Sequence, residues 1–84
     1  MQHYLFMCRS LTYAQRASRL LERAGITASV SRTPHSISGS GCGYCVSVQL
    51  RRGFEAASLL REAGLLQGSI YIAGEDGSLK ETSL

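Results

Sequence analysis

A chain of 84 residues, 44% of them hydrophobic, is long enough for one folded domain and too short to enclose a deep cleft. No apolar run approaches the roughly 20 residues that a membrane-spanning helix needs, and we expect no cleavable leader. The cysteine count of 3 is odd, which does not suit a secreted disulfide scaffold. We therefore expect a cytoplasmic protein without a membrane partner. The net charge of +3 is uneven, because residues 1–73 carry +5 and residues 74–84 carry −2.

The first half of the chain predicts a strand, a helix and a second strand. The run HYLFMCR (3–9) is apolar on both faces, as a central strand would be. Thr12 and Gln15 have the spacing of a capping box and predict a helix over residues 12–24. The run ITASVSR (26–32) then alternates apolar and polar residues, which is typical of a half-buried strand.

The second half of the chain repeats this pattern and ends in a polar segment. The run YCVSVQL (44–50) predicts a third strand, residues 54–63 predict a second helix, and SIYIA (69–73) predicts a fourth strand. Residues 74–84, GEDGSLKETSL from Gly74 onward, are polar, and we expect a turn followed by a flexible tail.

An internal echo supports this order of elements. ASRLLERAG (17–25) returns as AASLLREAG (56–64), which indicates a duplicated unit with a helix between strands. The order βαββαβ predicts an α+β fold of the ferredoxin-like split type over residues 1–73, with two helices on one face of a four-stranded antiparallel sheet. Right-handed crossovers would make the first and third strands its central, antiparallel pair.

This topology predicts that several polar and thiol groups meet at one end of the sheet. Cys8 and Arg9 end the first strand, Arg32 ends the second, and Cys42 and Cys45 lie at the start of the third. The N-terminus of the first helix begins beside the same end. A helix N-terminus or a nearby cation lowers the pKa of a thiol, so we expect a reactive thiol there.

Cys42 is the main candidate for a reactive thiol. Its neighbours Gly41 and Gly43 would expose the sulfur and turn backbone N–H groups toward an anion, although they are also typical of a loop hinge. Cys45 alternates onto the face that the helices leave uncovered, where it could resolve an oxidised Cys42. Cys8 lies in an apolar run and is expected to be a buried small hydrophobe.

Other chemistries of these thiols fit the sequence less well. In thioredoxin-like proteins the CxxC pair opens a helix, whereas CGYC here opens a strand. A zinc site of the three cysteines and His35 requires the loop to fold back, and we predict no bound metal and no cofactor. RNA-binding domains of this topology display several aromatic residues on the third strand, where only Tyr44 is present, so we expect no nucleic-acid partner.

The run YLFMCRSLTYAQRASRLLERAGITASVSRTPHSISGSGCGYCVSV resembles the putative selenium/sulfur carrier-like family of small bacterial domains, over roughly residues 3–73. The most specific part of the resemblance is the loop from Thr33 and Pro34 to Cys42 and Gly43. The resemblance implies a ferredoxin-like α+β fold and a role in handling selenium or sulfur through Cys42. Cys45 departs from the family pattern, which favours an aliphatic residue there.

The leading hypothesis is therefore a carrier in which Cys42 holds sulfur or selenium as a persulfide or perselenide, with Arg9 and Arg32 stabilising the anion. Its partners would be donor and acceptor proteins. The alternative is a non-catalytic interaction or regulatory module that uses the open sheet face, including Gln49 and Tyr71. A thiol metal-binding module is third, and pairing of the edge strands, the second and fourth, would give a homodimer.

Overall fold

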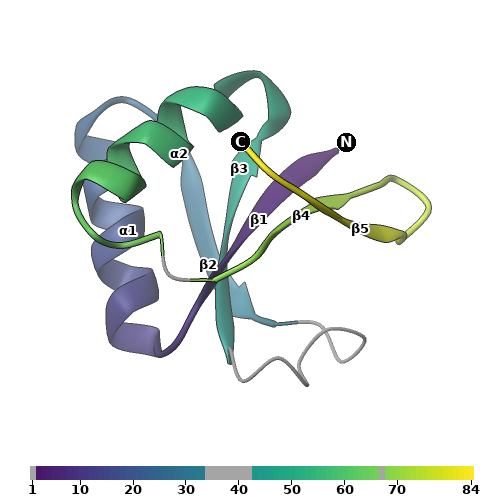
Figure 1. Cartoon of the computed structure of the whole chain (residues 1–84), viewed down its shortest axis with the longest axis horizontal. Coiled ribbons are helices and arrows are strands. Elements are labelled where there is room, and N and C mark those ends of the chain that lie inside the picture. The colour runs from purple at the N-terminus through teal and green to yellow at the C-terminus, as the bar shows by residue number, and fades with distance from the viewer. Residues whose placement is uncertain (1, 34–42, 67) are drawn as a thin grey trace.

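The computed structural model describes residues 2–33, 43–66 and 68–84. Over these residues the chain forms strands and helices in an order that begins as predicted (Figure 1). The elements are β1 (His3–Cys8), α1 (Leu11–Arg23), β2 (Ala28–Arg32), β3 (Tyr44–Gln49), the 3-10 helix η2 (Leu50–Arg52), α2 (Gly53–Glu62), β4 (Ile70–Ala73) and β5 (Leu79–Thr82).

The sheet is antiparallel, with the strand order β2-β3-β1-β4-β5. β1 lies in the centre, and its Phe6 pairs with Val46 of β3 on one side and with Ile70 of β4 on the other. The predicted antiparallel pairing of the first and third strands is confirmed. This central position explains why the sequence of β1 is continuously apolar: successive residues of the strand point to opposite faces of the sheet, and both faces are buried.

The sheet has five strands, so the predicted count of four is wrong. A turn after β4 brings the chain back as β5: the Gly74 amide donates to the carbonyl of Ser78 at 2.8 Å, and Gly77 has a φ of +84°. An edge strand is held by backbone hydrogen bonds and needs few apolar residues, which is why its polar sequence gave no strand signal. The sheet edges are therefore β2 and β5, while the flexibility expected for residues 74–84 stays a prediction.

Helix α1 begins at a different residue from the one that the sequence indicated. The N-cap is Ser10, whose hydroxyl accepts a hydrogen bond from the Tyr13 amide at 3.3 Å, and not Thr12. Ser10 has extended backbone angles, as an N-cap residue should. The helix ends at Arg23, one residue before the expected end, and Gly25 follows the C-cap Ala24 with a φ of +81°.

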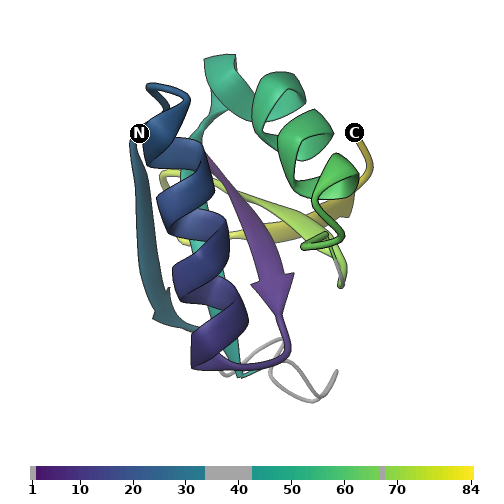
Figure 2. The same cartoon turned by 90° about the vertical axis from the view of Figure 1, so that its left-hand side faces the viewer.

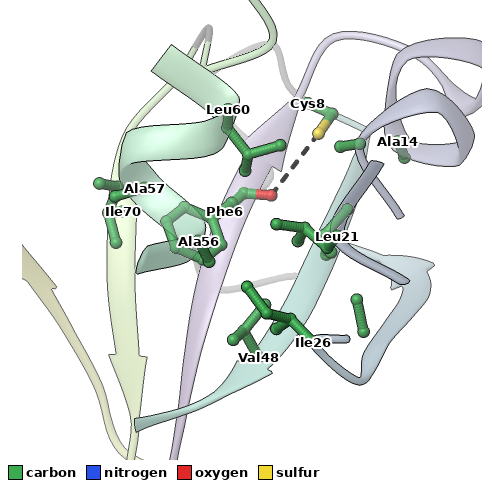
Figure 3. Packing of buried hydrophobic residues seen from close by; sticks show 13 residues of the cluster. Phe6, Cys8, Ala14, Leu21, Ile26, Val48, Ala56, Ala57, Leu60 and Ile70 are labelled. Atoms are coloured by element: carbon green, nitrogen blue, oxygen red, sulfur yellow. Dashed lines mark hydrogen bonds between the residues drawn. The ribbon is translucent and has the colours of Figure 1, made fainter. Parts of the chain in front are cut away.

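Both helices cover the same face of the sheet, as predicted, and enclose the main core (Figure 2). Small residues of the helices, Ala14, Ala17, Ala56 and Ala57, allow close approach, and larger side chains fill the space between the layers (Figure 3). The largest fully buried side chains of this core are Phe6, Leu21, Ile26, Val46, Val48 and Leu60.

A second, smaller cluster lies on the opposite face of the sheet. Leu5, Met7 and Cys45 are buried there, and half-buried apolar side chains of β4 and β5 pack against them, namely Tyr71, Ala73 and Leu79. The sequence predicted that this face would be open. β5 was missing from that prediction, and its Leu79 is part of the cluster.

Candidate functional site: the sheet end at Gly43

The ends of β1 and β2 meet the start of β3 at one end of the sheet. Cys8 and Arg32 flank Tyr44 as its register partners on the two neighbouring strands. One further hydrogen bond extends the ladder beyond β2, because the Thr33 amide donates to the carbonyl of Gly43 at 3.1 Å. The sequence-based expectation that these strand ends lie together is confirmed by this register.

The N-terminus of α1 begins beside the same end of the sheet. Only Arg9 and Ser10 separate β1 from the first helical residue, Leu11, and the turn lies next to the start of β3 (Figure 2). No acidic residue lies in the first turn of α1. The partial positive charge of the helix N-terminus is therefore not neutralised from within that turn.

The two arginines predicted to stabilise an anion are both exposed at this end. Arg32 lies with its guanidinium carbon 6.0 Å from the centroid of the Tyr44 ring, a cation–π arrangement that holds the side chain against the sheet. Arg9 follows β1 directly and is exposed. Their cationic groups are thus accessible to an anion, while an anion-binding role for either stays a prediction.

Cys42 and Gly41, two of the predicted site residues, lie outside the described residues. Gly43, the residue that follows Cys42 in the chain, is described and exposed. A Cβ on Gly43 would meet no atom of the described residues within 4 Å, and the φ of Gly43 is not in the left-handed region. Neither contacts with the described residues nor the backbone conformation therefore requires a glycine at this position.

Cys45 is buried, which corrects the expectation that it would be reachable. Its side chain is 1% exposed, and its sulfur lies 3.4 Å from the hydroxyl oxygen of Ser31 on β2. Burial raises the pKa of the Cys45 thiol, and the hydrogen bond with Ser31 offsets this only in part. The alternation of residues along β3 correctly predicted that Cys45 lies on the face opposite the helices, but the second cluster covers that face at this position. A resolving role for Cys45 stays a prediction that this environment does not favour.

Cys8 is buried in the main core, as the sequence predicted. It is 1% exposed, and its sulfur donates to the carbonyl of Phe6 at 3.7 Å (Figure 3). Cys8 packs with the helices, whereas Cys45 belongs to the cluster on the other face of the sheet. The sheet therefore separates these two thiols, and they cannot ligate the same metal ion. Within residues 2–33, 43–66 and 68–84, no three His, Cys, Asp or Glu side chains gather as metal ligands.

Thr33 has a feature that the sequence analysis missed. It is 9% exposed, and its hydroxyl is buried with no hydrogen-bond partner among the described residues. Leaving a buried hydroxyl without a partner costs on the order of 1–3 kcal/mol. Thr33 directly follows β2, and no sequence signal indicates that its hydroxyl is buried.

A shallow hollow lies at the opposite end of the sheet. Its volume is about 420 Å³, and it is lined by Gln2, Gln49, Leu50, Arg51 and Glu75. Gln49 is six residues from Gly43 along β3, which corresponds to about 20 Å. The structure therefore does not place this hollow beside the predicted thiol site, although it includes Gln49 of the interaction-module hypothesis.

No helix in the described parts of the chain has the length and apolar character needed to cross a membrane.

Comparisons with known proteins place the chain in a family. No curated protein and no solved structure matches the chain. The model of one family, described as putative Se/S carrier protein-like, matches residues 3–72. This match runs from the start of β1 into β4 and includes the sheet end at Gly43, and the chain belongs to the putative Se/S carrier protein-like family.

Proposed function

We propose that this protein carries sulfur or selenium in the cytoplasm as a persulfide or perselenide on Cys42. The family gives the general role, that of a selenium or sulfur carrier. The observation that carries the assignment to Cys42 is the burial of the other two cysteines. Cys8 and Cys45 are each 1% exposed and packed in separate clusters. Thiol exchange requires access of the donor to the thiolate, so it falls to the third cysteine.

The loading reaction is a thiol–persulfide exchange between the protein and a donor. The Cys42 thiolate attacks the outer sulfur of a donor persulfide, R–S–SH, and a new S–S bond forms while the S–S bond of the donor breaks. The electron pair leaves with the donor sulfur, which takes up the proton that the Cys42 thiol released when it became a thiolate. The products are Cys42–S–SH and R–SH, and no external oxidant or reductant is needed. Delivery to an acceptor thiol is the same exchange in the other direction.

The described surroundings of Gly43 support this chemistry. Gly41 and Gly43 flank Cys42 in the sequence and add no side chains beside it, and a Cβ on Gly43 would meet no described atom within 4 Å. Arg9 and Arg32 supply accessible positive charge at the same end of the sheet. Such a setting favours an anionic sulfur.

We further propose that β1 to β4 with the two helices are a ferredoxin-like unit to which β5 is added.

The experiment that tests this proposal combines loading with delivery. The purified protein is incubated with a low-molecular-weight persulfide, freed of reagent, and mixed with an acceptor thiol, and intact mass is measured before and after. We expect a gain of one sulfur that the acceptor removes. Cys42→Ser should gain none, while Cys8→Ala and Cys45→Ala load as the wild type does. Loading of Cys42→Ser to the wild-type level would contradict the proposal.

A role in protein interaction is a second candidate, because the hollow at the far end of the sheet contains Gln49. This hypothesis predicts that Gln49→Ala weakens association with a partner, whereas Cys42→Ser leaves it unchanged. The reverse result, loss of association with Cys42→Ser alone, would favour the carrier and argue against a separate docking role.

A further inference from the structure

Helix α1 carries a row of arginines on the side that faces away from the core. Arg16, Arg19 and Arg23 are exposed, and their spacings of three and four residues place them within about 60° of one another around the helix axis. The buried residues of α1, on the opposite side, are Ala14, Ala17 and Leu21. Figure 2 shows α1 in front of the sheet. We call the surface formed by Arg16, Arg19 and Arg23 the arginine face.

The charges of the arginine face are not neutralised by the described part of the protein. Arg52 and Glu55 form an ion pair at 2.9 Å, whereas no described residue forms an ion pair with the arginine face. Glu22, the acidic residue of α1, is exposed and pairs with none of its arginines. Arg16 lies with its guanidinium carbon 6.0 Å from the centroid of the Tyr13 ring, a cation–π arrangement that leaves its charge in place. The guanidinium groups can therefore accept an anion from outside the protein.

The fold does not require the repulsion within the arginine face. Like charges three and four residues apart on a helix repel each other and weaken the helix. Arg23 lies in the last turn of α1, where a cation interacts favourably with the helix dipole, but Arg16 and Arg19 do not lie there. Acidic groups bound from outside would relieve the repulsion, and a planar guanidinium can pair with a carboxylate or phosphate through two hydrogen bonds. The arginine face is therefore suited to an anionic partner.

The residues beside the arginine face favour a protein as that partner. Tyr13 and Leu20, three residues before and four residues after Arg16, are half-buried and pack against the main core. Arginine and tyrosine are enriched in interfaces between proteins. From Arg16 to Arg23 the face spans about 10 Å along the helix axis, too short for the roughly 6–10 phosphate contacts of many DNA-binding proteins. A two-fold contact between copies of this chain would bring two arginine faces together, which their charge opposes.

We propose that the arginine face of α1 is a docking surface for an acidic surface of a partner protein. Charges arranged in this way steer an oppositely charged protein toward the surface and fix its orientation there. The docking uses Arg16, Arg19 and Arg23 and does not depend on any chemistry of Cys42. Within the proposed function, the occupant would be a donor or acceptor protein.

The test is a titration of isotope-labelled protein with a synthetic peptide, followed through NMR chemical shifts. The peptide forms a helix with glutamates spaced three and four residues apart, and a control peptide has glutamines at the same positions. We expect the glutamate peptide to shift the backbone amide resonances of α1, and added salt to weaken its binding. The glutamine peptide should bind far more weakly.

Variants of the protein locate the charges that matter. The combined substitution Arg16→Gln, Arg19→Gln and Arg23→Gln should weaken binding of the glutamate peptide about tenfold, because exposed ion pairs contribute little singly but act together here. Arg19→Gln alone should weaken binding by a smaller factor. Lys80→Gln is the matched control, since it removes one exposed positive charge from β5, and it should bind as the wild type does.

Other results would overturn the inference. Equal binding of the two peptides, or peptide-induced shifts confined to other elements, would show that the arginine face is not a docking surface. Tighter binding of a single-stranded oligonucleotide through α1 would assign this face to nucleic acid, and shifts of α1 that depend on protein concentration alone would assign it to a second copy. Arg19→Gln still decides the test if the triple variant is unfolded. Cys42→Ser should bind the glutamate peptide as the wild type does, so failure of docking and failure of sulfur loading are separate results.

Discussion

Replacing Cys45 by alanine removes one buried sulfur atom from the cluster that Cys45 forms with Leu5 and Met7. Deleting a single buried methylene group costs about 0.5–1.5 kcal/mol of unfolding free energy, and sulfur is somewhat larger, so we expect a loss of about 1–2 kcal/mol. Ser31, which contacts this sulfur at 3.4 Å, is exposed and can bond to water instead. The packing loss therefore dominates the expected effect.

Thermal unfolding measures this effect. For a domain of this size, 1 kcal/mol corresponds to about 4–8 °C in Tm, so Cys45→Ala should unfold about 4–16 °C below the wild type. Ser47→Ala is the matched control, because Ser47 lies two residues along β3 on the same face and is only half-buried. We expect a change of no more than about 0.5 kcal/mol for this control.

The same variant separates packing from chemistry. Cys45→Ala should still accept one sulfur from a persulfide, because our account gives Cys45 a structural role. An unchanged Tm would show that the thiol is not packed as described. A lower Tm together with lost loading in the folded variant would show that Cys45 takes part in the chemistry, and the reasoning from its burial would be refuted.

Further predictions concern pH, backbone packing and capping. Because the pKa of Cys45 is raised above its ordinary 9.0, the folded state binds this proton more tightly than the unfolded chain does. The unfolding free energy of the wild type should thus fall relative to that of Cys45→Ala as the pH rises above 9.0, and parallel pH curves would contradict this. A Cβ on Gly53 would collide with the Tyr4 ring, so Gly53→Ala should lower the unfolding free energy, measured in urea, by about 1–3 kcal/mol. Gly43→Ala should be tolerated, and equal effects of the two substitutions would contradict the described packing. Ser10→Ala should cost about 1 kcal/mol through loss of the helix cap and Ser10→Asp much less, and equal losses would argue against the cap.

The sequence predicted most of the fold because its signals were local and periodic. The apolar run of β1, the alternation in β3 and the glycine after α1 each dictate a structure within a few residues. β5 was not predicted, because backbone pairing with β4 holds a strand whose sequence, LKET, has only Leu79 as an apolar residue. The N-cap was displaced by two residues because both Ser10 and Thr12 are good caps, and only the backbone angles distinguish them.

The candidate site was predicted less completely than the fold. Topology alone brought the ends of the first and second strands, at Cys8 and Arg32, beside the start of the third strand, and the register confirmed it. The burial of Cys45 depends on what packs over its face, which alternation within one strand does not reveal. The burial of the Thr33 hydroxyl without a partner among the described residues depends on three-dimensional packing, which the sequence does not reveal.

Locating the added sulfur on the wild-type chain is the most direct test of the central claim. The protein is loaded with a persulfide, the persulfide is trapped with an alkylating reagent, and peptide mass spectrometry identifies the cysteine that carries the extra atom. The account predicts that it lies on Cys42, with Cys8 and Cys45 unmodified in the folded protein. An extra sulfur on Cys45 or Cys8, or none on any cysteine, would contradict it.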